Sequence, residues 1–135
     1  MKYFLLACCV LLTACYHEPD TEWTPPIVQE QVECCITDQQ VHGAIYSALL
    51  KLRWHIKDKK DNGFIATIRC DYDNIDMVFE NTDREYFIAA NADIDNVFEY
   101  EYCIKSHMRK VNKYIKKYLK KAVRKAARKE LNGIR

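Results

Sequence analysis

Alternation of apolar and polar residues between positions 53 and 90 is the feature that most restricts the fold of this chain. A period of two over short segments is typical of β-strands that bury one face. Turn signals at residues 61–63, 71–74 and 81–83 divide the region into four segments, so the sequence predicts a four-stranded antiparallel meander. The apolar residues of the expected buried face are Phe64, Ala66, Ile68, Cys70, Ile75, Met77, Phe79, Tyr86, Ile88 and Ala90.

The segment that precedes these strands has the pattern of an amphipathic helix. Apolar residues recur at helical spacing from Val41 to Leu52. Thr37 and Gln40 stand three residues apart, as in a capping box, where each side chain bonds to the backbone N–H of the other residue. We therefore predict a helix over about Asp38–Leu52.

A longer helical pattern closes the chain. It predicts a helix over about Cys103–Leu131, with Gly133 as its stop, and the first half of this helix should cover the sheet beside the first helix. Residues 91–102 fit either a fifth short strand or a lead into the long helix. The expected fold is α+β: a four-stranded antiparallel meander packed by an N-terminal and a long C-terminal helix, in the order helix-β-β-β-β-helix.

The second half of the long helix carries paired basic residues at a spacing of four. On a helix of 3.6 residues per turn this spacing drifts by about 40° per repeat, so the apolar stripe should wind away from the sheet. We expect the helix to leave the domain near Leu119 and to continue as a cationic rod, a basic tail over residues 120–135. The basic residues expected to contact an anionic surface are Lys116, Lys117, Lys120, Lys121, Arg124, Lys125, Arg128 and Lys129.

The first residues have the pattern of an export signal. A positive Met1-Lys2 start leads into an apolar run that ends at Ala14, and a small residue precedes Cys15. The run has about a dozen residues, whereas a bilayer span needs about 20. Residues 12–15, Leu-Thr-Ala-Cys, match the lipobox of bacterial lipoproteins position by position. An ordinary signal peptide that contains a cysteine is the alternative.

The lipobox predicts removal of residues 1–14 and attachment of a diacylglycerol to Cys15. Two or three acyl chains, such as palmitate, make a durable membrane anchor, whereas one chain binds marginally. Residues 15–33 are polar and contain Pro25-Pro26, so we expect a tether to a domain over residues 34–119. Tyr16, in place of an aspartate, favours the outer membrane facing the periplasm over the inner membrane.

The net charge of +2 conceals two opposite parts of the chain. Residues 15–104 contain 18 acidic and 7 basic residues, whereas residues 105–135 contain 13 basic residues and one glutamate. Such asymmetry indicates an anionic partner or internal neutralisation. The expected partners are anionic lipid, lipopolysaccharide phosphates or an acidic envelope protein. We do not expect nucleic acid, which an exported lipoprotein rarely meets.

Four cysteines remain after the signal and the lipidated residue are set aside. An even number in an exported protein is consistent with disulfides, and sequence cannot choose among three pairings. Because neighbouring cysteines rarely pair with each other, we expect links from Cys34 or Cys35 to Cys70 or Cys103. Four reduced, partly buried thiols are the alternative.

Taken in order, several short motifs resemble those of a group of small, uncharacterised bacterial lipoproteins. The matching residues are Ile45, Ala48-Leu49, Arg53-Trp54, Gly63-Phe64-Ile65-Ala66, Ile88 and Asn112-x-Tyr114. The resemblance covers roughly Val41–Leu119 and implies an α+β lipoprotein fold, but no activity. The chain departs from the group after the last strand, where residues 91–94 replace the usual Ser-x-Asn-Leu segment.

No catalytic motif stands out in the sequence, which has no His-Glu-x-x-His, Gly-rich phosphate loop or nucleophile elbow. We therefore expect a non-enzymatic binding or scaffolding module of the bacterial envelope, without metal or cofactor. One alternative is a subunit of a larger envelope complex. Another is a metal-dependent or enzymatic site near Cys34, Cys35 and His42, although their spacing matches no standard zinc pattern.

The acidic residues of the expected sheet were also considered as calcium ligands. Their spacing lacks the glycine and the terminal glutamate of an EF-hand loop, so we interpret them as a solvated sheet edge that resists aggregation. These residues are Asp71, Asp73, Asp76, Asp93 and Asp95.

Overall fold

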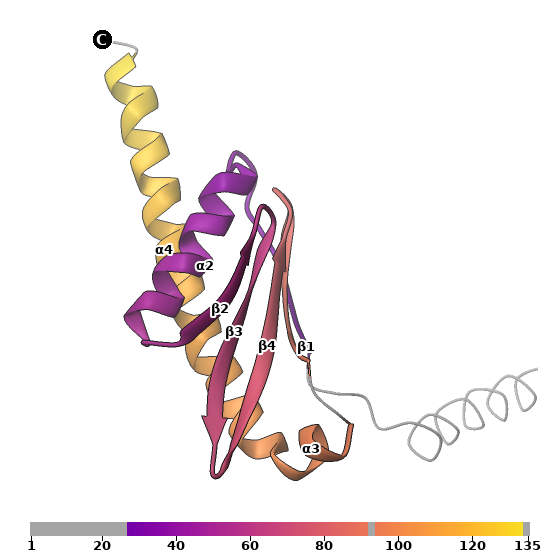
Figure 1. The fold of residues 1–135 in the computed structure, drawn as a ribbon. Helices are drawn as coiled ribbons and strands as arrows, with labels where there is room; N and C mark the ends of the chain where they lie inside the picture. Colours follow the sequence, from indigo (N-terminus) through magenta and orange to yellow (C-terminus); the bar gives the residue numbers. More distant parts are fainter. Residues whose placement is uncertain (1–26, 92–93, 134–135) are drawn as a thin grey trace, which may run out of the picture.

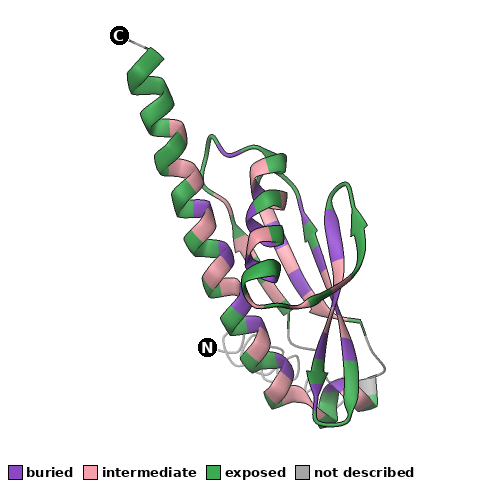
Figure 2. Ribbon diagram, turned by 60° about the vertical axis from the view of Figure 1, so that its left-hand side comes forward, coloured by how far each residue is buried: buried purple, intermediate pink, exposed green. Residues whose placement is uncertain are grey.

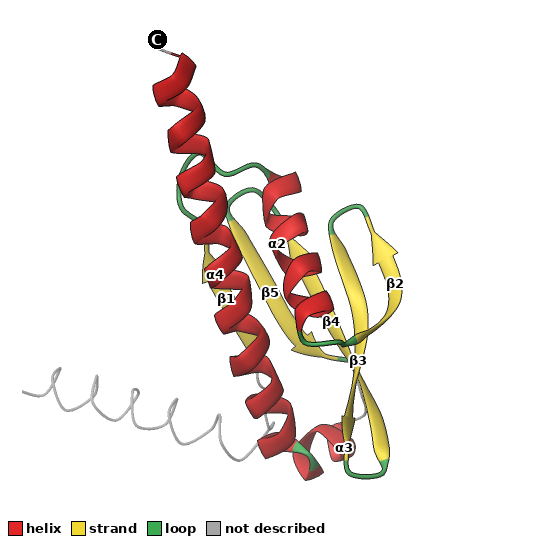
Figure 3. Cartoon of the chain, turned by 90° about the vertical axis from the view of Figure 1, so that its left-hand side faces the viewer, coloured by secondary structure: helices red, strands yellow, loops and turns green. Residues whose placement is uncertain are grey.

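Five antiparallel strands form one sheet in the order β1-β5-β4-β3-β2, and both long helices lie on the same face of it (Figures 1 and 3). The structure is a computed structural model that describes residues 27–91 and 94–133. The strands are β1 (Ile27–Gln31), β2 (His55–Lys60), β3 (Gly63–Cys70), β4 (Asp73–Asn81) and β5 (Glu85–Ala90). The helices are α2 (Asp38–Lys51), α3 (Ile94–Glu99) and α4 (Glu101–Gly133). The α+β class and the order of the helices and the meander are confirmed.

Helix α2 begins at the predicted capping box. The Gln40 backbone N–H donates to Thr37 Oγ1 at 3.1 Å, and the Thr37 N–H donates to Gln40 Oε1 at 2.9 Å. These two bonds satisfy backbone donors that the helix leaves without a partner in its first turn. Ile36 and Val41, on either side of the cap, are both buried in the core.

The alternation of the strands places apolar side chains under the helices, as predicted. On β4, Ile75, Met77 and Phe79 are buried, while Asp76 between them forms an ion pair with Lys57 at 2.9 Å on the opposite face. Figure 2 shows the same alternation as buried and more exposed bands along the strands. The start of β3 needs glycine, because a Cβ at residue 63 would collide with the carbonyl oxygen of the neighbouring strand β4.

The sheet has one strand more than the predicted meander. Residues 27–31, which the sequence assigned to the tether, form β1 and pair with β5 in the register Ile27↔Ala89 to Gln31↔Glu85. The assignment of this segment to the tether was therefore wrong. Backbone pairing to an existing edge specifies this strand, and its mostly polar side chains left no alternating apolar pattern in the sequence.

The segment after β5 is helical, which decides between the two predicted alternatives. Helix α3 leads into α4 and is not a further strand. The Tyr100 hydroxyl donates to Asp73 Oδ2 at 2.6 Å, and this bond, followed by burial, raises the pKa of Tyr100 to about 12. The junction of the two helices is thereby held against the turn between β3 and β4.

Helix α4 covers the sheet along its first half and extends past it (Figure 1). Its buried residues are Ile104, Met108, Val111, Ile115 and Leu119. The same stripe continues through Ala122 and Ala126, which are half-buried, and residues 127–133 are all exposed. The predicted winding of the stripe away from the domain is therefore wrong, because positions 115, 119, 122 and 126 alternate spacings of four and three and so keep facing the domain. Burial ends because the helix extends past the domain, and its exposed end includes large side chains such as Leu131.

A polar cluster joins α4 to the edge strand β1 and to its neighbour β5. The buried Tyr86 of β5 donates its hydroxyl to Asn112 Oδ1 at 2.5 Å, and Asn112 Nδ2 donates to Glu30 of β1 at 3.2 Å. Burial, together with the charge of Glu30, raises the pKa of Tyr86, so its hydroxyl remains a donor. Glu30 also pairs with Lys116 at 3.1 Å. Asn112 thus serves as both acceptor and donor at the centre of the cluster.

Replacement of Asn112 by alanine should lower the free energy of unfolding by about 1–3 kcal/mol, because the buried Tyr86 hydroxyl loses its acceptor. Denaturant unfolding measures the loss. The matched control is the double variant Tyr86→Phe/Asn112→Ala, in which no hydroxyl is left without a partner. Its loss should be smaller than the sum of the two single losses; simple additivity would contradict the coupling.

Candidate functional site

A cationic surface runs along the side of α4 that faces away from the sheet. We call it the outer α4 face, and it encloses a shallow depression of about 560 Å³. Its residues come from successive turns of one helix, so their spacing is fixed by the helical repeat. They are Lys113, Tyr114, Lys116, Lys117, Lys120, Lys121 and Arg124.

The charges of the outer α4 face are largely uncompensated. Within the described residues, Lys116 is the member of this face that forms an ion pair, and its partner is Glu30. Two other lysines lie over aromatic rings, Lys117 at 5.8 Å from the Tyr114 centroid and Lys121 at 5.4 Å from that of Tyr118. Such contacts orient the ammonium groups without neutralising them. The face can therefore attract an anionic surface.

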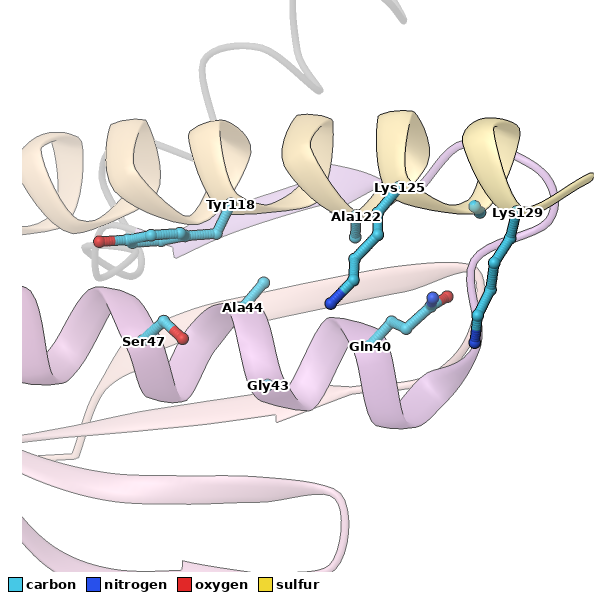
Figure 4. Close-up of a pocket in the computed structure, with 9 residues that line it drawn as sticks. Gln40, Gly43, Ala44, Ser47, Tyr118, Ala122, Lys125 and Lys129 are labelled. Atoms are coloured by element: carbon cyan, nitrogen blue, oxygen red, sulfur yellow. The ribbon is translucent and has the colours of Figure 1, made fainter. Parts of the chain in front are cut away.

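A groove of about 460 Å³ separates α4 from α2 (Figure 4). We call it the α2–α4 groove. Where the core ends, small side chains line the groove, namely Ala44 of α2 and Ala122 of α4. A Cβ added at Gly43 would meet no atom within 4 Å. The lining residues are Gln40, Gly43, Ala44, Ser47, Tyr118, Ala122, Lys125, Ala126 and Lys129.

Lys125 and Lys129 belong to this groove and not to the outer α4 face. In Figure 4 their side chains reach from α4 toward the first turns of α2, near the Gln40 amide. Lys129 continues the stripe that is apolar in the first half of the helix. The structure thus divides the basic residues of the predicted rod between two surfaces, while Arg128 is exposed and lines neither.

The loop between β1 and α2 lies along the other flank of α4. Val32 and Ile36 of this loop share a groove of about 370 Å³ with Leu119 and Val123. With the α2–α4 groove on the opposite flank, α4 is accompanied past Leu119 on two sides. Leu119 is the last buried residue of α4, as expected, but the helix leaves the domain gradually, and its fully exposed part begins at residue 127.

The disulfide differs from the predicted pairings. Cys70 at the end of β3 is bonded to Cys103 at the start of α4, with 6.0 Å between their Cα atoms. Cys34 and Cys35 are exposed free thiols in a turn, with their Sγ atoms 3.1 Å apart. The hydrogen bond between them, more than the charge of Cys34, raises the pKa of Cys35. The predicted links from Cys34 or Cys35 were wrong because α4 returns along β3 and brings the other two cysteines together.

The three residues of the alternative metal site are not gathered as a ligand cluster in the described part of the chain. The His42 ring stacks on Phe64 at 4.2 Å, and its Nε2 lies 3.0 Å from the Lys60 carbonyl oxygen. A different group, Cys70, Cys103 and His107, does lie within ligand distance. The two sulfurs of this group are joined to each other in the disulfide, so they are not thiolates that could bind a metal.

Two of the predicted acidic residues, Asp73 and Asp76, form contacts within the fold. Asp76 accepts from Lys57 at 2.9 Å and from the Thr67 hydroxyl at 2.9 Å, and the Lys57 bond lowers the pKa of this carboxyl. Asp73 is the acceptor for Tyr100. Asp71 adopts a φ of 55° in the turn between β3 and β4. Asp93 lies outside the described residues, as do Cys15 with the lipobox and the tether up to residue 26.

Among the helices that the structure describes, none has both the length and the apolar character needed to cross a bilayer.

Two kinds of site residue were not predicted from the sequence. Lys113 and Tyr114 join the outer α4 face, and the spacing of four from Lys113 to Lys117 and Lys121 was a signal that could have identified the first of them. Gln40 and Ser47 of α2 gave no signal, because their position in the groove depends on how two helices pack.

No protein-family model, curated protein or solved structure matches the chain. The resemblance to the group of small bacterial lipoproteins therefore stays a prediction.

The disulfide makes a direct prediction about which thiols react. Maleimide labelling of the unreduced, denatured protein should modify Cys34 and Cys35, whereas Cys70 and Cys103 should react only after reduction. Peptide mapping by mass spectrometry identifies the labelled residues. A peptide that joins Cys34 or Cys35 to either of the other two would contradict the pairing.

The disulfide also stabilises the fold, because it closes a loop with a sequence separation of 33 residues. A closed loop of this length contributes about 3–4 kcal/mol to stability, so Cys70→Ser/Cys103→Ser should unfold at lower denaturant concentration.

Proposed function

We propose that this chain is a non-enzymatic lipoprotein of the bacterial envelope, anchored through a lipid on Cys15, whose outer α4 face binds an anionic surface. The lipobox at residues 12–15 supports the anchor. The proposed location is the outer membrane, facing the periplasm, because Tyr16 and not an aspartate follows Cys15. The domain would act as a small binding or scaffolding module that requires neither metal nor cofactor.

The observation that carries the binding proposal is the outer α4 face itself. Six basic side chains from about three turns of one helix share this face, and one of them is paired with a carboxylate in the described structure. Apart from Glu30, the acidic residues of the domain for which the structure gives bonds are engaged elsewhere, as Asp76 is with Lys57. Near an anionic bilayer each Lys or Arg contributes about 1 kcal/mol, so several together give appreciable attraction.

Binding to anionic vesicles should depend on the outer α4 face. The test uses the chain from residue 15 onward with Cys15→Ser, so that no lipid contributes, and vesicles of phosphatidylglycerol and phosphatidylcholine. The triple variant Lys117→Gln/Lys120→Gln/Lys121→Gln should bind about 100-fold more weakly, since each lysine contributes about 1 kcal/mol and 1.4 kcal/mol is a factor of ten. Sedimentation with the vesicles measures the affinity.

The matched control is Lys51→Gln/Lys59→Gln/Lys60→Gln, which removes the same charge from α2 and β2. It should keep most of the binding. Wild-type binding should also weaken between about 0.1 M and about 1 M salt, where the Debye length falls from about 10 Å to about 3 Å. Equal loss in the two triple variants would show that only net charge matters, and the assignment to the outer α4 face would be wrong.

The anchor is tested separately by intact mass. Protein purified from bacterial membranes should begin at Cys15 and carry the added mass of acyl chains, and the Cys15→Ala variant should lack this mass. An unmodified chain cleaved at another position would refute the lipid anchor, while leaving the binding by α4 to be judged on the vesicle experiment.

A further inference from the structure

We propose that the α2–α4 groove is a specific site for the phosphate of a hydroxylated anionic lipid headgroup, of the phosphatidylglycerol type. The inference rests on the proposed function and names a ligand for it. The outer α4 face attracts any anionic surface, whereas the groove selects one headgroup from that surface.

The dimensions of the groove suit such a ligand. Its volume of about 460 Å³ lies within the range of about 300–1,000 Å³ that is usual for small-molecule sites. The width results from Ala44, Ala122 and Gly43, at positions where larger side chains would fill the space between the two helices. The groove is open along one side, so a headgroup can enter while its acyl chains stay in the membrane.

The cationic end of the groove defines the charge of the ligand. Lys125 and Lys129 stand one helical turn apart and are directed toward the N-terminal turns of α2 (Figure 4). The N-terminus of a helix carries a partial positive charge, so the two ammonium groups and the helix end reinforce each other. Neither lysine forms an ion pair in the described structure.

Asp38 and Glu130 are the acidic residues next to this end of the groove in sequence, and within the described residues neither forms an ion pair with Lys125 or Lys129. An oxygen of the exposed Asp38 carboxylate accepts the Gln39 backbone N–H at 2.8 Å. Glu130 contributes to the raised pKa of Cys35, which places its charge on the side of the β1–α2 loop. A phosphate would therefore supply the negative charge that the two lysines lack.

The residues at the other end of the groove indicate which chemical group is attached to the phosphate. Ser47 of α2 and Tyr118 of α4 lie at the end opposite the lysines, and both have hydroxyl groups (Figure 4). Hydroxyls can donate to and accept from the hydroxyls of a glycerol headgroup. A choline headgroup has no hydroxyl to pair with them, and its positive charge would be repelled by Lys125 and Lys129. The site should therefore distinguish phosphatidylglycerol from phosphatidylcholine.

The experiment follows alanine methyl signals by NMR in the full lipidated chain reconstituted into nanodiscs. The Ala44 and Ala122 methyl groups lie in the groove and report its occupancy. Increasing the phosphatidylglycerol fraction in phosphatidylcholine discs should shift both signals in a saturable manner, and discs of pure phosphatidylcholine should not. Soluble glycerol 1-phosphate is the second probe. Saturation by it at matching concentration would overturn the assignment to a membrane lipid.

Variants separate the groove from general attraction. Lys125→Gln/Lys129→Gln should raise the half-saturating fraction about tenfold, because each charge-assisted bond to a phosphate is lost. The matched control Lys59→Gln/Lys60→Gln removes two lysines from β2, outside both the groove and the outer α4 face, and should change it less than threefold, about the spread expected of a distant charge. Ala122→Leu fills the groove without any change of charge and should abolish the shift of Ala44. Thermal unfolding confirms that each variant is folded.

The outcomes distinguish the two proposals. If both lysine pairs weaken the shift equally, or if Ala122→Leu still responds, the groove is not a site and the outer α4 face remains. If the triple variant of the outer α4 face binds vesicles as wild type does while the groove titrates as described, the proposed function fails at that face and the groove alone binds lipid.

Discussion

Burial of a single face of the sheet under α2 and the first half of α4 is the interaction on which the structure depends. It explains why the strands alternate and why both long helices lie on the same side. The buried stripe of α4 from Ile104 to Leu119 is about 24 Å long at 1.5 Å per residue, close to the length of about 27 Å of the eight-residue strand β3. The helix continues for another 14 residues, to Gly133, and this excess length carries both lysines of the α2–α4 groove and part of the outer α4 face.

The opposite charges of the two parts of the chain are neutralised only locally. Glu30 of β1 faces Lys116, and Glu101 pairs with Lys105, but most of the basic residues of α4 lie beyond these contacts. The first half of α4 must be apolar on one side to cover the sheet, whereas the second half is free of that requirement. Its sequence can therefore change from core residues to alanine and lysine without loss of the fold.

The sequence predicted what depends on local pattern and missed what depends on distant contacts. The capping box at Thr37, the alternating strands and the long helix follow from spacing alone, and the structure agrees with each of them. The side chains of strand β1 are mostly polar, and the strand is specified by hydrogen bonds to β5. No alternation of apolar and polar residues could therefore predict it. The pairing of Cys70 with Cys103 and the groove facing Lys125 both require knowledge of how α4 returns along the domain.

On the proposed function, the position of β1 sets the geometry of the molecule at the membrane. Ile27 begins the strand at the end of the sheet near α3, whereas α4 ends beyond the opposite end of the sheet (Figure 1). Residues 15–26 reach at most about 40 Å when fully extended, less than the length of about 50 Å of α4. On the proposed function, a domain standing upright on its anchor would hold the far end of α4 away from the bilayer. Contact along the whole helix requires the domain to lie on its side, so attachment at two points would fix its orientation as well as its location.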